Sequence, residues 1–119
     1  MEHHPTKDIS IETLGDSCGD LHIIKVRGAL TIHNFFDFQD LTRKQSATVL
    51  LIDLEEVPYI DSAALGCLIG IHVACEKAGR SYALVNANER LKKLFSVAGV
   101  DRLLVTYDSL ADAQTSLCK

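Results

Sequence analysis

One serine of this chain stands where its hydroxyl group could be chemically modified. Ser62 follows Asp61 and precedes the apolar residues 63–71, and an apolar stretch of strand length, residues 49–54, ends shortly before it. This order predicts a buried strand, a polar turn and a helix that begins at Ser62. The N-terminus of a helix presents exposed N–H groups and a partial positive charge, which stabilise a phosphate group placed there. The pattern indicates a surface hydroxyl that is modified and recognised rather than one that performs catalysis.

A simpler interpretation of Ser62 is that its hydroxyl caps the helix. Serine is a favoured N-cap because its oxygen accepts a hydrogen bond from a backbone N–H two or three residues further on. The spacing alone favours this capping role over phosphorylation, and the two roles are compatible with each other.

The sequence gives little support for catalysis by the chain itself. A serine hydrolase needs a histidine close to its serine, but His72 lies well down the same predicted helix and no G-x-S-x-G motif is present. His3 and His4, or His22 with Cys18, lack the ligand spacing typical of zinc sites. Glycine-rich nucleotide-binding motifs are also missing. We therefore expect no enzyme activity, no cofactor and no metal, and any ATP would belong to a partner protein.

Composition and charge indicate one globular domain that does not bind nucleic acid. The 119 residues are 47% hydrophobic, which is enough apolar material for a single core. The formal net charge is −4 and the 12 basic residues are scattered, whereas nucleic-acid binding needs lysine and arginine clustered on one face. We expect a single domain over residues 1–119, in which residues 1–8 form a flexible N-terminal arm.

Cysteine usage and hydropathy favour a cytoplasmic location. The four cysteines show no C-x-x-C spacing, and Cys67 and Cys75 fall in or near an apolar helix, where free thiols behave as small hydrophobic groups. The chain starts without an apolar secretory signal, and its longest apolar stretch, residues 63–71, is too short to span a bilayer. We expect reduced thiols and no insertion into a membrane.

The order of apolar stretches predicts strands that alternate with helices. Strands are expected at residues 9–13, 21–27, 49–54, 82–85 and 103–106, with a turn over residues 15–20 that makes a hairpin of the first two. Helices are expected at residues 31–43, 62–77, 87–98 and from Ser109 to about Leu117. The alternation predicts an α/β fold with a mixed, largely parallel sheet of about four to five strands and about four helices packed on it.

Three details of these helices can be compared with the structure. The helix over residues 31–43 should turn several apolar side chains inward: Phe35, Phe38, Leu41 and, as a further candidate, Phe36. The helix over residues 62–77 should end at Gly79, a residue suited to the left-handed position that follows a helix. In the next helix, Asn86 and Glu89 have the spacing of a capping box. One apolar stripe should cover that helix: Leu91, Leu94, Phe95 and Ala98.

The stretch around Ser62 also resembles a known family. Residues 53–66 read Asp-Leu-x-x-Val-x-Tyr-Ile-Asp-Ser-x-x-Leu-Gly, which is similar to the signature of STAS domains, the bacterial anti-sigma factor antagonists. Residues 26–30, 88–100 and 107–110 resemble further segments of that family, so the likeness spans about residues 9–117. The resemblance implies that Ser62 is phosphorylated by a partner kinase and that the unphosphorylated form captures an anti-sigma factor and so releases a sigma factor.

The same resemblance implies specific partners and contact residues. The anti-sigma factor would be a serine kinase of the histidine-kinase-like ATPase superfamily, and a serine phosphatase would reset Ser62. The residues expected to contact the partner are Thr31, His33, Asn34, Asp61, Ala63, Ala64, Leu65 and Gly66. Acidic residues also lie close to Ser62 in the sequence: Asp53, Glu55, Glu56 and Asp61. A phosphate on Ser62 would add to this negative charge and repel an acidic partner surface.

The chain departs from the family pattern at two places, and an alternative role stays open. Many members have Ser-Ser-Gly-Leu-Gly where residues 62–66 read Ser-Ala-Ala-Leu-Gly, which leaves one candidate hydroxyl. Thr31 stands where members often have an acidic contact residue, and either His33 and Asn34 replace that contact or they are an ordinary helix start. The alternative function is a structural accessory subunit that docks on the ATPase of a lipid transport machine, as small stand-alone STAS domains do.

Overall fold

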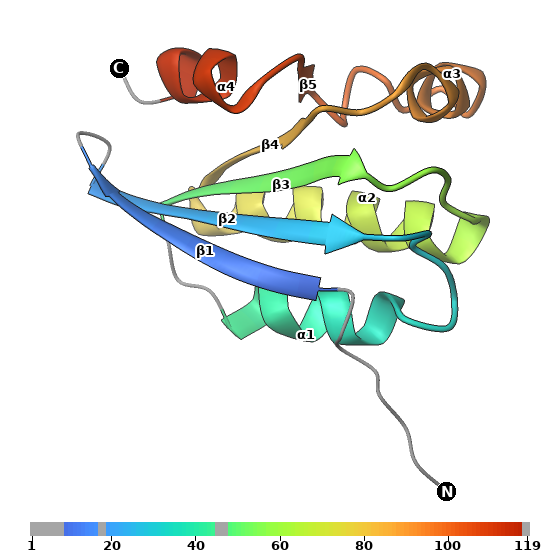
Figure 1. Ribbon diagram of the computed structural model, residues 1–119, viewed down its shortest axis with the longest axis horizontal. Coiled ribbons are helices and arrows are strands. Elements are labelled where there is room, and N and C mark those ends of the chain that lie inside the picture. The colour runs from blue at the N-terminus through green and yellow to red at the C-terminus, as the bar shows by residue number, and fades with distance from the viewer. Residues whose placement is uncertain (1–8, 17–18, 45–47, 118–119) are drawn as a thin grey trace, which may run out of the picture.

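Five strands form one sheet in the order β1-β2-β3-β4-β5, so neighbours in the sequence are also neighbours in the sheet (Figure 1). The computed structural model describes residues 9–16, 19–44 and 48–117, and the expected arm over residues 1–8 lies outside them. Strand β1 is antiparallel to β2, whereas β2, β3, β4 and β5 are parallel. The strands are Ile9–Asp16 (β1), Gly19–Arg27 (β2), Val49–Glu56 (β3), Ser81–Val85 (β4) and Thr106–Tyr107 (β5). The helices are Phe35–Lys44 (α1), Ser62–Ala78 (α2), Glu89–Val97 (α3) and Leu110–Leu117 (α4). The predicted α/β fold with a mixed, largely parallel sheet is confirmed.

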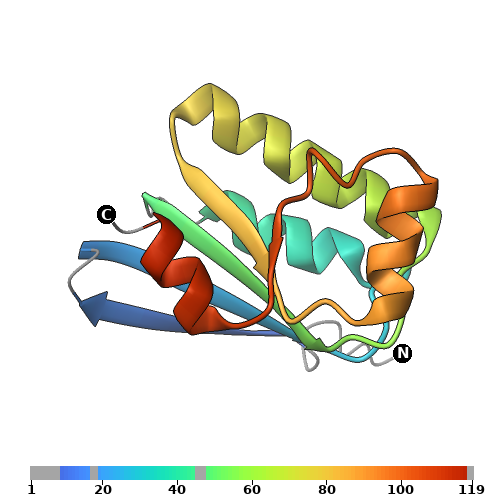
Figure 2. The same cartoon turned by 90° about the horizontal axis from the view of Figure 1, so that it is seen from above.

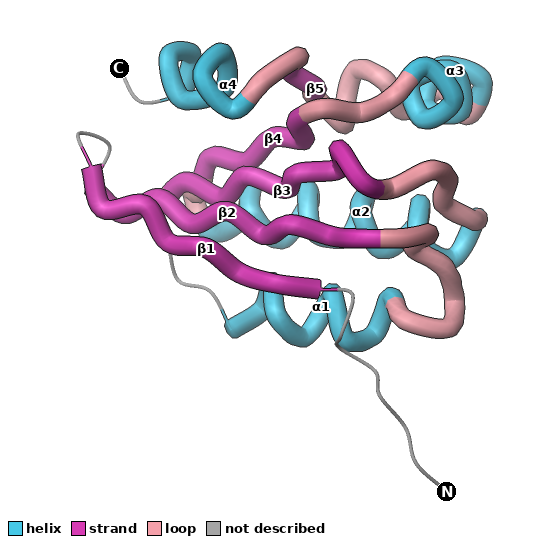
Figure 3. The backbone as a smooth tube through the Cα atoms, in the orientation of Figure 1, coloured by secondary structure: helices cyan, strands magenta, loops and turns pink. Residues whose placement is uncertain are grey.

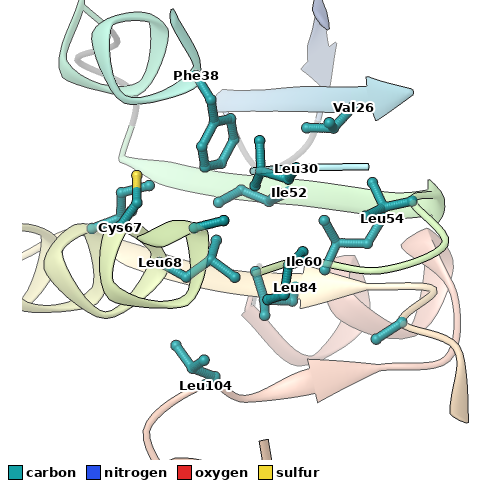
Figure 4. Packing of buried hydrophobic residues seen from close by; sticks show 14 of the residues in the cluster. Val26, Leu30, Phe38, Ile52, Leu54, Ile60, Cys67, Leu68, Leu84 and Leu104 are labelled. Atoms are coloured by element: carbon teal, nitrogen blue, oxygen red, sulfur yellow. The ribbon is translucent and has the colours of Figure 1, made fainter. Parts of the chain in front are cut away.

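Helices lie on both sides of the sheet, with α1 and α2 on one face and α4 on the other (Figure 2). The side chains of β3 alternate between the two sides: Leu50 and Ile52 join a large apolar cluster with α1, α2 and α3, while Val49 and Leu51 join a smaller cluster that includes Ala113 of α4. Figure 4 shows the large cluster, where helix and strand side chains meet. A strand buried on both faces was predicted for residues 49–54 and is confirmed.

Helix α2 is the most apolar helix of the domain because it packs lengthwise against the sheet. Its buried residues recur every three or four positions: Ala64, Cys67, Leu68, Ile71 and Cys75. The helix ends at Gly79, whose φ of 70° lies in the left-handed region. The Gly79 N–H donates to the Glu76 carbonyl at 3.2 Å, and the Arg80 N–H donates to the Cys75 carbonyl at 2.9 Å. The predicted glycine C-cap is therefore confirmed.

The two cysteines of α2 are buried free thiols, as predicted. Burial raises the pKa of the Cys67 thiol to about 11, and burial also raises the pKa of the Cys75 thiol. Both side chains consequently stay protonated at neutral pH and act as apolar groups of the core. The other two cysteines, Cys18 and Cys118, lie outside the described residues.

Helix α1 begins later than predicted, because Asn34 holds the preceding residues in a turn. The Asn34 side-chain oxygen accepts from the Thr31 N–H at 2.9 Å, and its amide donates to the Ala29 carbonyl at 2.9 Å. Phe38 is fully buried as predicted, and the half-buried Phe35 packs against the same cluster together with the half-buried Leu41. The proposal that Phe36 turns inward is wrong, since its side chain is 67% exposed.

The N-cap of α3 is Asn88, so the predicted capping box with Asn86 is wrong. The Asn88 side-chain oxygen accepts from the Leu91 N–H at 2.8 Å. Asn86 instead ends β4 with a left-handed φ of 62°, and its amide donates to the buried Asp53 carboxylate at 3.1 Å. Asn86 and Asn88 are two residues apart and both suit a cap, and the tertiary bond of Asn86 to Asp53 decides between them. Leu91 and Phe95 are buried as predicted, Leu94 is half-buried, and Ala98 is exposed.

Two other predicted boundaries are also wrong. The strand expected over residues 103–106 is a turn up to Leu104, because the N–H groups of Leu103 and Leu104 both donate to the Val100 carbonyl, and pairing with β4 starts only at Thr106. The hairpin turn expected over residues 15–20 is shorter, since residues 15–16 and 19–20 pair with each other in β1 and β2.

We expect Asn88→Ala to lower the free energy of unfolding by about 1 kcal/mol, the usual cost of losing an N-cap acceptor. Urea unfolding followed by circular dichroism measures this change. Asn88→Asp separates the two roles of this side chain: it keeps an acceptor oxygen at the cap but loses the amide donor to the Val57 carbonyl at 3.2 Å, so it should give an intermediate stability. An unchanged urea midpoint for Asn88→Ala would contradict the assignment of this cap.

Candidate functional site

The loops that follow β2 and β3 meet at one edge of the sheet, where the parallel strands end (Figure 3). Backbone hydrogen bonds join the two loops: the Leu30 N–H donates to the Tyr59 carbonyl at 3.2 Å, and the Asp61 N–H donates to the Leu30 carbonyl at 3.3 Å. Leu30 and Ile60 form a parallel bridge, and both side chains are buried in the large cluster. Carboxyl ends of parallel strands are the usual place for binding sites in such sheets.

The carboxylate of Asp61 holds this edge together. Its Oδ1 accepts from the Ala64 N–H at 2.9 Å and so caps α2, while its Oδ2 accepts from the Ile32 N–H at 2.9 Å in the neighbouring loop. These two backbone donors, that of Ala64 first, lower the pKa of the Asp61 carboxyl below its ordinary value. One ionised side chain therefore fixes both the start of α2 and the path of residues 28–34.

The interpretation that the Ser62 hydroxyl caps α2 is wrong, because Asp61 is the N-cap. Ser62 is the first residue of the helix and is exposed. Asp61 and Ser62 are both good capping types, and Asp61 takes the role because its second oxygen also reaches Ile32. Within residues 9–16, 19–44 and 48–117, no hydrogen bond engages the Ser62 hydroxyl. The hydroxyl is therefore accessible at the positive end of a buried helix.

Most of the acidic residues near Ser62 in the sequence point elsewhere. Asp53 is buried and accepts from Asn86 and from the Glu55 N–H. Glu55 lies 3.7 Å from the Lys25 ammonium, and Glu56 lies 3.3 Å from it. Of the four acidic residues considered, only Asp61 belongs to the helix start at Ser62.

The predicted contact residues divide into exposed and internal groups. His33 and Gly66 are exposed, and Ala63 and Leu65 are half-buried. Ala64 is fully buried in the core, so a partner cannot pack on its side chain as predicted. Thr31 and Asn34, both half-buried, are engaged in the turn before α1: the Thr31 Oγ1 accepts from the His33 N–H at 3.2 Å, and Asn34 bonds as described above.

Sequence reasoning missed two large apolar side chains at this edge. Ile32 is 57% exposed and its N–H binds Asp61, and Tyr59, in the other loop, is 47% exposed. Phe36 adds a third exposed apolar side chain at the start of α1. We call the exposed residues Ile32, His33, Tyr59 and Ser62 the Ser62 surface. The signal in the sequence is a single isoleucine between the polar residues Thr31 and His33, and the prediction of one helix over residues 31–43 conceals it.

Within the part of the chain that the structure describes, the side chains considered for a hydrolase or a metal centre are not brought together. His72 lies ten residues after Ser62 on α2, a rise of about 15 Å, and its ring is 3.7 Å from Glu76. Among the described residues, no group of three or more His, Cys, Asp or Glu side chains could hold a metal ion. In the same described part of the chain, no helix is long and apolar enough to cross a membrane.

A model of the STAS domain matches residues 14–113. The chain belongs to the STAS domain family. A relative from Thermotoga neapolitana, provisionally named an anti-sigma factor antagonist, is 33% identical over 76 residues, which cover 64% of this chain and 66% of that relative. An anti-sigma-B factor antagonist from Staphylococcus epidermidis is 24% identical over 100 residues, which cover 82% of this chain and 91% of the relative. The first match thus spans slightly less than two thirds of its relative's length.

Solved structures share the fold of this STAS domain. The crystal structure of a Thermotoga maritima protein, also provisionally named an anti-sigma factor antagonist, has a TM-score of 0.81 at 24% identity, over 98% of this chain and 100% of that one. The anti-sigma factor antagonist SpoIIAA in its unphosphorylated form has a TM-score of 0.71 at 15% identity, over 91% and 95%. A sulfate transporter family protein from Wolinella succinogenes has a TM-score of 0.68 at 20% identity, over 82% and 84%.

We expect Asp61→Ala to lower the Tm at neutral pH, because the Ala64 and Ile32 N–H groups lose their acceptors. Asp61→Asn has one acceptor oxygen, so it should keep the helix cap, lose the bond to Ile32 and give an intermediate Tm. Differential scanning fluorimetry at neutral pH measures all three proteins. Equal Tm values for the wild type and Asp61→Ala would contradict the role given to this carboxylate.

The effect of Asp61 on stability should also depend on pH. Since its pKa is lowered in the folded chain, its contribution is present above the ordinary carboxyl pKa of 3.8 and is lost as the pH falls through the folded value. The Tm difference between the wild type and Asp61→Ala should therefore shrink on acidification below about pH 4. A Tm difference that stays constant in that pH range would show that the ionised carboxylate of Asp61 is not the form that accepts the two hydrogen bonds.

Proposed function

We propose that this protein is an anti-sigma factor antagonist whose partner binding is controlled by phosphorylation of Ser62. The observation that supports this function best is an accessible hydroxyl, unused by the helix cap, at the N-terminus of α2 and beside exposed apolar side chains. Such a surface suits a protein that binds a partner and is switched by a charge. The proposed location is the cytoplasm.

The unphosphorylated Ser62 surface would be covered by an anti-sigma factor. Ile32 and Tyr59 supply apolar area next to Ser62, and aromatic side chains with a polar tip are frequent centres of binding energy in protein interfaces. Exposed apolar side chains grouped with polar ones are a usual mark of an interaction surface. Partner-contact roles for His33, Asp61, Ala63, Leu65 and Gly66 belong to the same proposal.

Phosphorylation would prevent this complex without unfolding the domain. A phosphate adds about −1.5 to −2 charges to Ser62 at neutral pH, and a partner seated on Ile32 and Tyr59 would have to remove water from that charge. The N-terminal end of α2 favours a nearby negative charge by about 0.3–1 kcal/mol, and this offsets part of the repulsion from Asp61. Because Asp61 already caps the helix, the modification does not take away a hydrogen bond that the fold needs.

The partners in this proposal are the anti-sigma factor itself, acting as a serine kinase of the histidine-kinase-like ATPase superfamily, and a serine phosphatase. Relatives named anti-sigma factor antagonists support the first part of this assignment. A role as an accessory subunit of a transport machine is the second candidate, and the same fold also occurs in a sulfate transporter family protein.

The proposal predicts that Ser62→Asp abolishes partner binding, whereas Ser62→Ala binds like the wild type but cannot be switched off. Wild type, Ser62→Asp and Ser96→Asp serve as baits in lysate of the source organism, and Ser96 is an exposed serine of α3 that controls for added charge. Mass spectrometry should find an anti-sigma factor with a kinase domain on the wild-type and Ser96→Asp baits only. Incubation of that purified protein with ATP should phosphorylate wild type and leave Ser62→Ala unmodified.

Two outcomes would reject the switch. Equal affinity of the purified anti-sigma factor for wild type and Ser62→Asp, measured by surface plasmon resonance, would exclude control by charge at Ser62. Capture of transport subunits by all three baits would favour the accessory-subunit role.

We also expect Tyr59→Ala and Ile32→Ser each to weaken binding of the same anti-sigma factor, by about tenfold for Tyr59, because a central aromatic contact often contributes more than 1 kcal/mol. The matched control is Val97→Ser, which removes an exposed apolar side chain at the C-terminal end of α3. Surface plasmon resonance compares the three variants. Normal binding by Tyr59→Ala and Ile32→Ser would place the interface elsewhere.

A further inference from the structure

The outer side of α1 is apolar only at the end that adjoins the Ser62 surface. Exposed side chains recur there every four residues, along the helix and the turn before it: Ile32, Phe36, Asp40 and Lys44. The first two are apolar, with exposed fractions of 57% and 67%, and the last two are charged. The outer face of a helix on a soluble domain is normally polar. The apolar half of this face therefore lies where the partner of Ser62 is proposed to bind.

Backbone hydrogen bonds connect Phe36 to the Ser62 surface. The Phe35 N–H donates to the Thr31 carbonyl at 2.8 Å, so residues 31–35 form a helical turn that leads directly into α1. Within this turn the Ile32 N–H donates to the Asp61 carboxylate at 2.9 Å. The bonds that fix Ile32 at the start of α2 consequently also fix the first turn of α1, in which Phe36 lies.

The ring of Phe36 is held in one orientation although it is exposed. It stacks on the ring of Phe35, with the two ring centroids 4.3 Å apart and the ring planes inclined by 27°. Phe35 is half-buried and packs against the large apolar cluster, so the stack ties the exposed ring to the core. A side chain that is already ordered loses little conformational entropy when a partner covers it. Phe36 is thus prepared for binding in the free protein.

The remaining exposed large apolar side chains among residues 9–16, 19–44 and 48–117 lie on other elements. They are Val73 in the C-terminal half of α2, Val97 at the end of α3, and Leu103 and Val105 before β5. Ile32, Phe36 and Tyr59 are the ones that belong to the two loops and the helix start around Ser62. Exposed apolar side chains that are grouped in this way mark an interaction surface, whereas single ones do not.

We propose that Phe36 is the anchor residue of the complex with the anti-sigma factor and inserts its ring into an apolar pocket of that protein. This inference rests on the proposed function and adds the residue that selects the partner. A phenyl ring has no polar tip, so a pocket with polar groups would lose their hydrogen bonds to water on binding, and an apolar pocket would not. Aromatic side chains seated in desolvated pockets commonly dominate the binding energy of an interface.

Surface plasmon resonance with the purified anti-sigma factor that the wild-type bait captures tests the anchor. Phe36→Ala should weaken binding at least about tenfold, mainly through faster dissociation. Asp40→Ala is the matched control, since it makes the same truncation one turn further along the same face and should change the affinity less than about twofold. Both positions are exposed, and circular dichroism confirms that the variants are folded.

Phe35 has a positioning role that a double-mutant cycle isolates. Phe35→Leu keeps an apolar side chain against the core but removes the ring that supports Phe36, so it should weaken binding by about threefold. In the Phe36→Ala background the same change should have no further effect on affinity, because the supported ring is already missing. A general loss of structure would weaken binding equally in both backgrounds.

Nuclear magnetic resonance locates the ring without a substitution in the interface. The chain has four phenylalanines, so ring-labelled protein gives few signals, and the signal that Phe36→Ala lacks is that of Phe36. Addition of the unlabelled anti-sigma factor should shift this signal more than that of Phe95, which is buried in α3. Equal shifts of the two signals would overturn the proposal.

The outcomes separate the anchor from the switch. Wild-type affinity in Phe36→Ala, or an equal loss in Asp40→Ala, would overturn the anchor even if Ser62→Asp abolishes binding. Normal binding by Ser62→Asp together with a tenfold loss in Phe36→Ala would support the anchor and reject control by phosphorylation. If the wild type binds no anti-sigma factor, both proposals are overturned.

Discussion

The double hydrogen bond of the Asp61 carboxylate is the interaction on which the arrangement of this edge depends. Two parallel strands, β2 and β3, end side by side, and each is followed by a loop that has to cross the end of the sheet before its helix begins. Asp61 takes one N–H from the start of α2 and one from Ile32 of the other loop. Leu30 and Ile60 are buried beneath this contact, so polar bonding above and apolar packing below fix the same geometry. This arrangement fixes the positions of Ser62 and of the side chains around it.

The capping role of Asp61 also changes what a modification of Ser62 can do. If Ser62 were the cap, a phosphate on its oxygen would remove the acceptor that holds the first turn of α2. Because Asp61 caps the helix, the hydroxyl is not needed by the fold, and charge can be added at the cost of repulsion from the Asp61 carboxylate. The other nearby acidic groups are occupied: Asp53 is bonded to Asn86, and Glu56 lies beside Lys25 and Arg27. The fold therefore separates the residue that stabilises the helix from the residue proposed to carry the signal.

Periodicity predicted most of the fold, whereas the details of the site depended on contacts between distant residues. The strand over residues 49–54 and the helix from Ser62 to Gly79 follow from apolar patterning and one glycine, which are local properties. Tertiary bonds decide which of two neighbouring residues caps each helix. Asp61 rather than Ser62 caps α2 because Asp61 also bonds to Ile32, and Asn88 rather than Asn86 caps α3 because Asn86 bonds to Asp53. Neither bond is visible in a local window. The exposure of Ile32 was missed for the same reason, because the Asn34 side chain keeps residues 31–34 out of helix α1.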